Sequence, residues 1–120
     1  MESLDALTKF HELWAYSLVI LGGNDVPNYL RYSIGEEILK ELKQIGYLID
    51  YANKQTKHYD RIKSAREADR IFQQVKFDFN LMLYHKALAK RRGHLYELEA
   101  ELGKMLGGWL NYLTSNGERC

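Results

Sequence analysis

Hydrophobic residues recur at steps of three and four through four stretches of the chain, the spacing of one face of an α-helix. The pattern predicts helices over about 3–21, 27–53, 62–90 and 94–115. Their apolar faces are, in order, Leu4, Leu7, His11, Trp14, Leu18 and Leu21; Leu30, Ile34, Ile38, Leu42, Ile45 and Ile49; Ala65, Ala68, Phe72, Val75, Phe79 and Met82; and Leu95, Leu98, Leu102, Leu106, Trp109 and Leu113. Phe10 and Leu13 widen the face of the first helix. Each face needs a partner to cover it, so we expect the helices to pack together.

Turn-forming residues separate the four stretches. Gly22 and Gly23 follow the first stretch, and Pro27 suits the first turn of the second helix. The polar segment NKQTKHYD ends the second stretch, and Gly93 follows the third. Because short connections favour antiparallel neighbours, we expect an all-α, up-down-up-down antiparallel four-helix bundle, forming one domain over 1–120. The tail TSNGERC is expected to be frayed.

Composition restricts the class of protein. Hydrophobic residues make up 46% of the chain, which argues against intrinsic disorder. Its one cysteine, Cys120, leaves no disulfide within the chain, which suits a reducing compartment. The N-terminus MESLDALTKF lacks the features of a secretory signal, and the apolar stretch 13–21 is too short to span a bilayer. We therefore expect a cytoplasmic protein with no membrane partner.

The net charge of +1 conceals an uneven distribution. Residues 1–53 hold four basic and eight acidic residues, whereas 54–92 hold eleven basic and four acidic ones. Residues 93–120 hold two basic and four acidic residues. A basic middle between acidic ends makes a polyanion a candidate partner.

The basic segment supplies the candidate nucleic-acid ligands. These are Lys54, Lys57, Arg61, Lys63, Arg66, Arg70, Lys86, Lys90, Arg91 and Arg92. Arg66 and Arg70 are four residues apart, so they share one helical face. Such a row can neutralise several phosphates, with an affinity that falls steeply as salt rises. The alternative is a solvated polar face paired with Glu67 and Asp69, and composition leaves both interpretations open.

We find no pattern that predicts catalysis. No histidine has a carboxylate three residues before it, as a di-iron bundle would require, and HELWA has Ala15 where a zinc protease has its second histidine. The chain has neither a P-loop nor a G-x-S-x-G motif. His11, on an apolar face, is expected to be a hydrogen-bonded core or interface residue. We therefore expect no catalytic residue, no metal and no cofactor.

Residues 102–113, LGKMLGGWLNYL, place three glycines in a helical pattern beside a tryptophan. Each glycine costs a helix about 1 kcal/mol relative to alanine. Gly103 and Gly107 are four residues apart, and we expect them on a face away from the leucines, where they allow a close approach by another helix. We predict that Gly103, Gly107, Gly108, Trp109 and Trp14 form a helix-packing or oligomer interface.

The same stretch resembles the closing motif of the accessory variability determinant proteins of diversity-generating retroelements. That family is similar to the four-helix-bundle group named for the 23S ribosomal RNA intervening-sequence protein. The resemblance extends to VPNYLRYSIGEEI at 26–38, where Pro27, Arg31, Tyr32 and Gly35 match a proline, a basic-aromatic pair and a glycine. Nearly the whole chain is covered.

Two features favour the retroelement subgroup over the ribosomal-insert proteins. The stretch LKQIGYLIDYAN lacks their small-residue segment with proline and asparagine, and the chain carries the Gly107-Gly108-Trp109 that they tend to lack. One feature departs from the family, because Glu36 and Glu37 stand where polar or basic residues are typical.

The resemblance implies a homopentameric barrel of four-helix protomers with a basic surface. It also implies binding to the retroelement's reverse transcriptase and to its template RNA, with the cDNA as a further candidate ligand, during mutagenic retrohoming. The accessory protein has no active site of its own, since the polymerase chemistry belongs to its partner. The alternative is a structural or adaptor bundle of the ribosomal-insert type, which binds a protein or ribosomal RNA.

Overall fold

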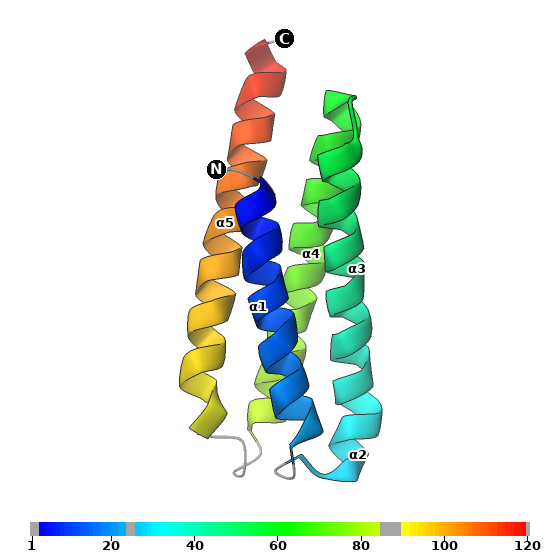
Figure 1. Ribbon diagram of the computed structural model, residues 1–120, viewed down its shortest axis with the longest axis vertical. Coiled ribbons are helices and arrows are strands. Elements are labelled where there is room, and N and C mark those ends of the chain that lie inside the picture. Colours follow the sequence, from blue (N-terminus) through cyan, green and yellow to red (C-terminus); the bar gives the residue numbers. More distant parts are fainter. Residues whose placement is uncertain (1–2, 24–25, 85–89, 120) are drawn as a thin grey trace.

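The computed structural model describes residues 3–23, 26–84 and 90–119, and within these ranges it contains helices and no strand. The elements are α1 (Ser3–Gly22), α2 (Asn28–Leu30), a π-helical turn η1 (Arg31–Gly35), α3 (Glu36–Lys54), α4 (His58–Leu83) and α5 (Arg92–Arg119). Because α2, η1 and α3 follow one another without a gap, the chain forms four helical columns (Figure 1). The predicted all-helical fold is confirmed.

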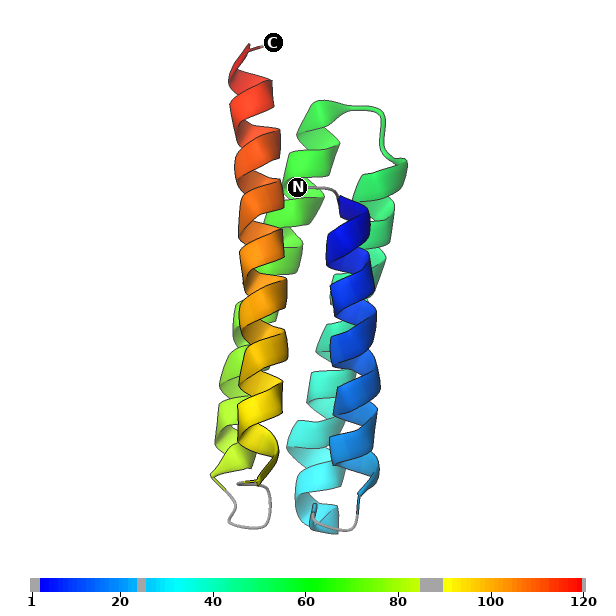
Figure 2. The same ribbon diagram turned by 60° about the vertical axis from the view of Figure 1, so that its left-hand side comes forward.

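The four columns lie side by side in a body of 51 × 23 × 19 Å (Figures 1 and 2). α1 and α4 each pack against both α3 and α5. α3 and α4 are joined at one end of the bundle, which we call the hairpin end. The last turn of α1, the first turns of α2 and α5 and the last turn of α4 lie at the opposite end. Since α1 stops short of the hairpin end, α3, α4 and α5 form that end.

The core contains the predicted apolar faces of the last three columns almost unchanged. Leu30 and Ile34 are half-buried, whereas the remaining members of these faces are buried. The largest fully buried side chains include Trp109, Phe72 and Phe79. The three-and-four spacing therefore identified the packed side of these helices correctly, because each has polar residues on its opposite side.

The predicted face of α1 is only partly correct: Phe10, Leu13 and Leu21 are buried, and Leu7 and Trp14 are half-buried against the core. The buried residues of α1 are Ala6, Phe10, Leu13, Ser17, Ile20 and Leu21, and Ser17 donates a hydrogen bond to the Leu13 carbonyl at 2.7 Å. By contrast His11 is exposed and Leu18 is 45% exposed. α1 is apolar around much of its circumference, so spacing alone did not decide which side enters the core.

The second column differs from the single helix predicted over 27–53. It runs from Asn28 to Lys54 and includes the wider turn η1. The Arg31 guanidinium donates to the carbonyls of Leu21 (2.9 Å) and Gly23 (2.7 Å), so it satisfies the end of α1. At Gly35 a β-carbon would lie 3.0 Å from Leu21 Cδ2, so this turn packs closely against α1. These tertiary contacts have no signature in the hydrophobic spacing.

The other helix boundaries also differ from the prediction. α4 begins at His58 rather than 62 and ends at Leu83 rather than 90, and α5 continues to Arg119 instead of fraying after 115. Residue 84 is followed by 85–89, which lie outside the described residues. Arg92 donates to the Leu83 carbonyl (3.0 Å from Nε), so its guanidinium satisfies the end of α4.

A glycine outside the glycine-rich motif is approached more closely by a neighbouring helix than Gly103 or Gly107 is. A β-carbon at Gly46 of α3 would lie 2.8 Å from Phe10 of α1, whereas one at Gly103 would lie 3.2 Å from Phe72. A β-carbon at Gly107 would meet nothing within 4 Å. The expected close approach by another helix is therefore found at Gly103, which packs against Phe72 of α4, and not at Gly107 within the protomer.

Candidate nucleic-acid interface

Toward the hairpin end, the outward side of α4 carries three cations and a tyrosine in one row. Tyr59, Lys63, Arg66 and Arg70 recur at three- and four-residue steps, and all four are exposed. They lie opposite the buried Ala65, Ala68 and Phe72 of the same helix. Three of the predicted nucleic-acid ligands, Lys63, Arg66 and Arg70, are therefore brought together on one surface.

The exposed side of α3 carries a second group of cations and aromatic rings, most of which the sequence analysis did not assign, and two of them, Lys43 and Tyr47, also line the groove between α1 and α3. Lys43, Tyr47, Tyr51 and the predicted Lys54 follow one another along α3, and all are exposed. We call the eight residues Lys43, Tyr47, Tyr51, Lys54, Tyr59, Lys63, Arg66 and Arg70 the basic-aromatic face. The signal was available in the sequence, because Lys43, Tyr47 and Tyr51 recur every four residues opposite the buried isoleucines 45 and 49.

A shallow hollow of about 510 Å³ lies on this part of the bundle. Tyr47, Tyr51 and Lys54 of α3 line it together with Ser64 of α4. At this hollow the two exposed tyrosines of α3 therefore lie next to Ser64, a buried residue of α4.

Two cations of the basic-aromatic face are already paired with carboxylates. Arg70 Nε lies 3.1 Å from both carboxylate oxygens of Glu67, and this hydrogen bonding lowers the pKa of Glu67. Lys54 Nζ lies 2.9 Å from Asp50. Among the described residues, Lys63 and Arg66 have no ion-pair partner. These two cations can therefore meet a phosphate without first losing an ion pair.

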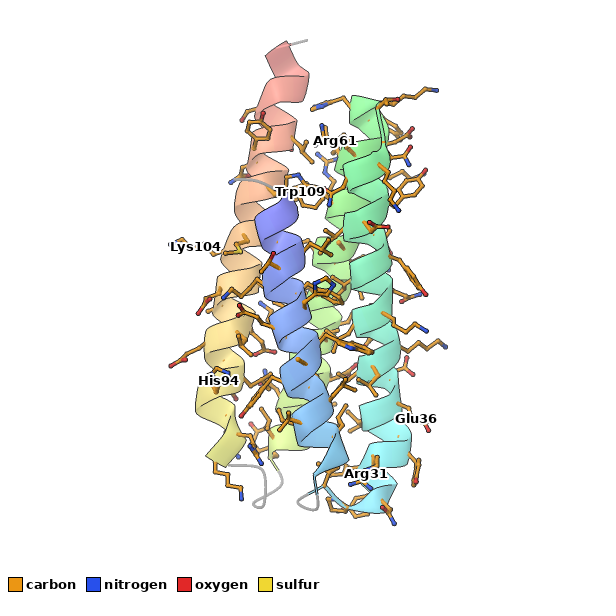
Figure 3. The ribbon with its side chains drawn as sticks, viewed as in Figure 1. Arg31, Glu36, Arg61, His94, Lys104 and Trp109 are labelled. Carbon is orange, nitrogen blue, oxygen red and sulfur yellow. The ribbon has the colours of Figure 1, made fainter. Side chains whose placement is uncertain are left out.

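Arg61, another predicted nucleic-acid ligand, does not belong to the outward row. Its side chain is half-buried, and its Nε is buried without a hydrogen-bond partner among the described residues. Figure 3 shows Arg61 in the same part of the bundle as Trp109. The neighbouring His58 contacts the Leu113 carbonyl through Nε2 at 2.5 Å, so this turn of α4 also packs against α5. Lys57, by contrast, is exposed at the hairpin end.

The remaining predicted ligands lie at the opposite end of the bundle. Lys90 is exposed and Arg91 is half-buried, while Arg92 is held by the Leu83 carbonyl. Lys86 lies outside the described residues. The predicted ligands therefore form two separate groups, and Arg92 has a structural contact that the prediction did not include.

An acidic groove follows the basic-aromatic face along the same two helices. The groove measures about 550 Å³ and is lined by Glu37, Glu41, Gln73, Gln74, Phe77 and Asp78. Burial, a hydrogen bond with Asp78 and the charges of Asp78 and Glu37 raise the pKa of Glu41 to about 8. Glu36 is exposed on the neighbouring turn (Figure 3). This end of the α3–α4 pair is unfavourable for phosphate.

A second buried carboxylate lies on α5. Glu99 is 6% exposed, and burial raises its pKa to about 7, while the nearby charge of Lys76 acts in the opposite direction. Glu99 Oε2 has no hydrogen-bond partner among the described residues. A buried carboxylate without a full set of partners is costly when ionised, so Glu99 is a source of pH-dependent stability.

The predicted interface residues are distributed between the core and two surfaces. Trp109 is 1% exposed and belongs to the core. Trp14 is half-buried beside a groove of about 410 Å³ between α1 and α3. Gly107 and Gly108 are partly exposed on α5.

The described part of the chain has neither a metal-ligand cluster nor a membrane-spanning helix. Within it, no three histidine, cysteine or carboxylate side chains come together as metal ligands. No described helix is both long and apolar enough to cross a membrane. No known protein family, curated protein or solved structure matches the chain.

Proposed function

We propose that this chain is a non-catalytic, nucleic-acid-binding accessory subunit of a diversity-generating retroelement. It binds the reverse transcriptase and the template RNA, and it supports mutagenic cDNA synthesis and retrohoming. The observation that carries nucleic-acid binding is the basic-aromatic face, with its unpaired cations Lys63 and Arg66. The retroelement assignment rests on the resemblance of residues 26–38 and 102–113 to that family.

The cations of this face act by neutralising phosphates. Each contact releases condensed counterions, so the affinity falls as the salt concentration rises. Lys63 and Arg66 supply these contacts directly, and Arg70 does so at the cost of its ion pair with Glu67. The chain contributes binding and positioning, whereas the polymerase chemistry belongs to the reverse transcriptase.

The functional unit in this proposal is a cytoplasmic homopentamer of up-down-up-down antiparallel protomers. The partly exposed Gly107 supports a subunit contact on α5, because nothing lies within 4 Å of the position of a β-carbon there. A Gly107→Leu substitution should then reduce the mass of the assembly in light scattering while thermal unfolding still reports a folded protomer. Gly93→Leu is the control, since a β-carbon there also meets nothing within 4 Å. An unchanged mass for the Gly107 variant would contradict this contact.

A second candidate is a structural or adaptor bundle of the ribosomal-insert type, which binds a protein or ribosomal RNA. Exposed apolar side chains beside the acidic groove favour a protein partner. Phe77 is 62% exposed and Leu81 is 46% exposed on α4, and Tyr84 follows at 83%. Exposed apolar groups gathered together are typical of protein-binding surfaces.

Fluorescence anisotropy with a structured RNA, measured across a salt series, tests the proposal. We expect binding whose logarithmic salt slope corresponds to about four phosphates. The triple variant Lys63→Gln, Arg66→Gln and Arg70→Gln should lose most of this binding and lower the slope. Lys104→Gln is the control, because Lys104 is exposed on α5, away from α3 and α4 (Figure 3).

Two results would favour the adaptor bundle over the accessory subunit. One is an absence of RNA binding at low salt, and the other is equal binding by the triple variant and the native protein. Co-purification with the reverse transcriptase then separates the two candidates further, because only the accessory subunit is expected to bind it.

A further inference from the structure

Three tyrosines of the basic-aromatic face are exposed to solvent. Tyr47 is 66% exposed, Tyr51 is 50% exposed and Tyr59 is 73% exposed. None of their hydroxyl groups makes a hydrogen bond within the described residues. Each ring therefore offers an open π-face beside cations, the combination that proteins use to hold unpaired bases.

The spacing of Tyr47 and Tyr51 restricts the kind of nucleic acid that can use both rings. They are one turn apart on α3, which separates them by about 6 Å along the helix axis. Bases in a duplex are stacked about 3.4 Å apart along each strand. Two neighbouring bases can contact both rings only when they are separated from each other, as they are in an extended single strand.

Cations flank the two rings along the same helix. Lys43 lies one turn before Tyr47, and Lys54 lies three residues after Tyr51. Together they span about 16 Å of α3. A backbone passing over the rings therefore meets a lysine at each end, Lys43 directly and Lys54 once its ion pair with Asp50 is broken, while Lys63 and Arg66 are exposed on the neighbouring α4.

The acidic groove restricts the direction in which a bound strand can extend along α3. Glu37 and Glu41 lie on α3 before Lys43, so a phosphate backbone is disfavoured in that direction. In the other direction lie Lys54, Lys57 and Lys63, all of which are exposed. A bound strand is therefore held on the hairpin end of the bundle.

We propose that the basic-aromatic face binds single-stranded nucleic acid in preference to a duplex, with adjacent unstacked bases on Tyr47 and Tyr51 and their flanking phosphates at Lys43 and Lys54. This inference rests on the proposed nucleic-acid-binding function and adds the class of ligand. The tyrosines supply strand preference, and the cations supply the salt-dependent part of the affinity.

The test compares an oligouridine RNA of about 12 nucleotides with an RNA duplex of the same length, by fluorescence anisotropy over a salt series. Tyr47→Ala with Tyr51→Ala should weaken single-strand binding at least about tenfold. The logarithmic salt slope should stay unchanged, because no phosphate contact is removed. Binding to the duplex should also stay unchanged.

Two matched variants accompany the alanine variant. Tyr47→Phe with Tyr51→Phe keeps both rings and should bind the single strand like the native protein, which also guards against a loss that arises from misfolding. Tyr112→Ala removes an exposed tyrosine of α5, outside the face, and should leave binding unchanged.

The outcomes separate this inference from the proposed function. If the native protein binds RNA with the expected salt slope but the alanine variant binds the single strand equally well, this inference is overturned and the proposed function stands. Equal weakening for single strand and duplex overturns it as well. If the native protein binds neither RNA at low salt, both proposals fail.

Discussion

The two ends of the α3–α4 pair present opposite chemistry on the same two helices. Toward the hairpin end, residues 42–70 contain seven basic and four acidic residues, and their exposed side chains include lysines, arginines and tyrosines. Toward the other end lie Glu36, the acidic groove and the exposed Phe77. A net charge of +1 therefore describes neither end.

The difference shows how helix packing separates charges that alternate along the sequence. Glu41 lies only two residues before Lys43, but it faces α4 and is 9% exposed, whereas Lys43 is exposed to solvent. The carboxylate enters a groove where burial raises its pKa, and the ammonium stays in water. Each charge then acts on a different partner, so position within the bundle decides its effect.

Exchanging the charges of the two ends gives the largest expected effect. The variant Lys63→Glu, Arg66→Glu, Glu36→Lys and Glu37→Lys keeps the net charge but moves positive charge away from the tyrosines. We expect binding to single-stranded RNA to fall about 100-fold, because phosphates then meet carboxylates beside the rings. Anisotropy at one fixed salt concentration measures it, and retained affinity would show that net charge alone matters.

The buried carboxylate of the acidic end should make stability depend on pH. Burial raises the pKa of Glu41 from 4.5 to about 8, so its contribution is fully present below 4.5 and is lost as pH rises through 8. We expect the native protein to lose on the order of 1–2 kcal/mol between pH 5.5 and 9, measured by urea unfolding.

Single substitutions distinguish the contributions of Glu41 and Glu99 in the same urea-unfolding experiment. The side chain of the Glu41→Gln variant stays neutral, so part of the loss of unfolding free energy up to about pH 8 should disappear. The Glu99→Gln variant should reduce this loss mainly below about pH 7. Identical pH profiles for the native protein and both variants would show that neither carboxylate is responsible.

Removing the acidic boundary should extend the binding surface. Glu36→Lys with Glu37→Lys, with Lys63 and Arg66 kept, adds positive charge next to Lys40 and Lys43. We expect the affinity for a longer single-stranded RNA to rise about fivefold, and the salt slope to increase by up to about 2 phosphate contacts. An unchanged slope would indicate that nucleic acid does not reach this part of α3.

The smallest effect is expected at the exposed apolar residue beside the acidic groove. Phe77→Ser should change the free energy of unfolding by no more than about 0.5 kcal/mol, because the ring is 62% exposed. RNA affinity should also be retained, since Phe77 lies outside the basic-aromatic face. If Phe77→Ser weakened RNA binding, nucleic acid would contact both ends of the α3–α4 pair. The two ends would then not differ in nucleic-acid binding.

The candidate site was only partly predictable from the sequence. Lys63, Arg66 and Arg70 were identified because spacing along one helix predicts a shared face. The surroundings of Arg61 and Arg92 could not be predicted, because their contacts depend on where other helices end and pack. Tyr47 and Tyr51 were not assigned, although their four-residue spacing opposite the buried isoleucines was visible in the sequence; the hollow that they line beside Ser64 exists only once α3 and α4 pack together.

The sequence by itself determined the all-helical class and the packed faces of the last three columns, because apolar and polar residues there alternate with the helical period. Tertiary structure decided the orientation of α1, whose apolar surface exceeds one face, and the ends of α4, where other side chains satisfy the backbone. It also decided that the tightest contact occurs at Gly46 rather than Gly107. A close approach depends on what lies opposite a glycine, and that neighbour comes from a distant part of the chain.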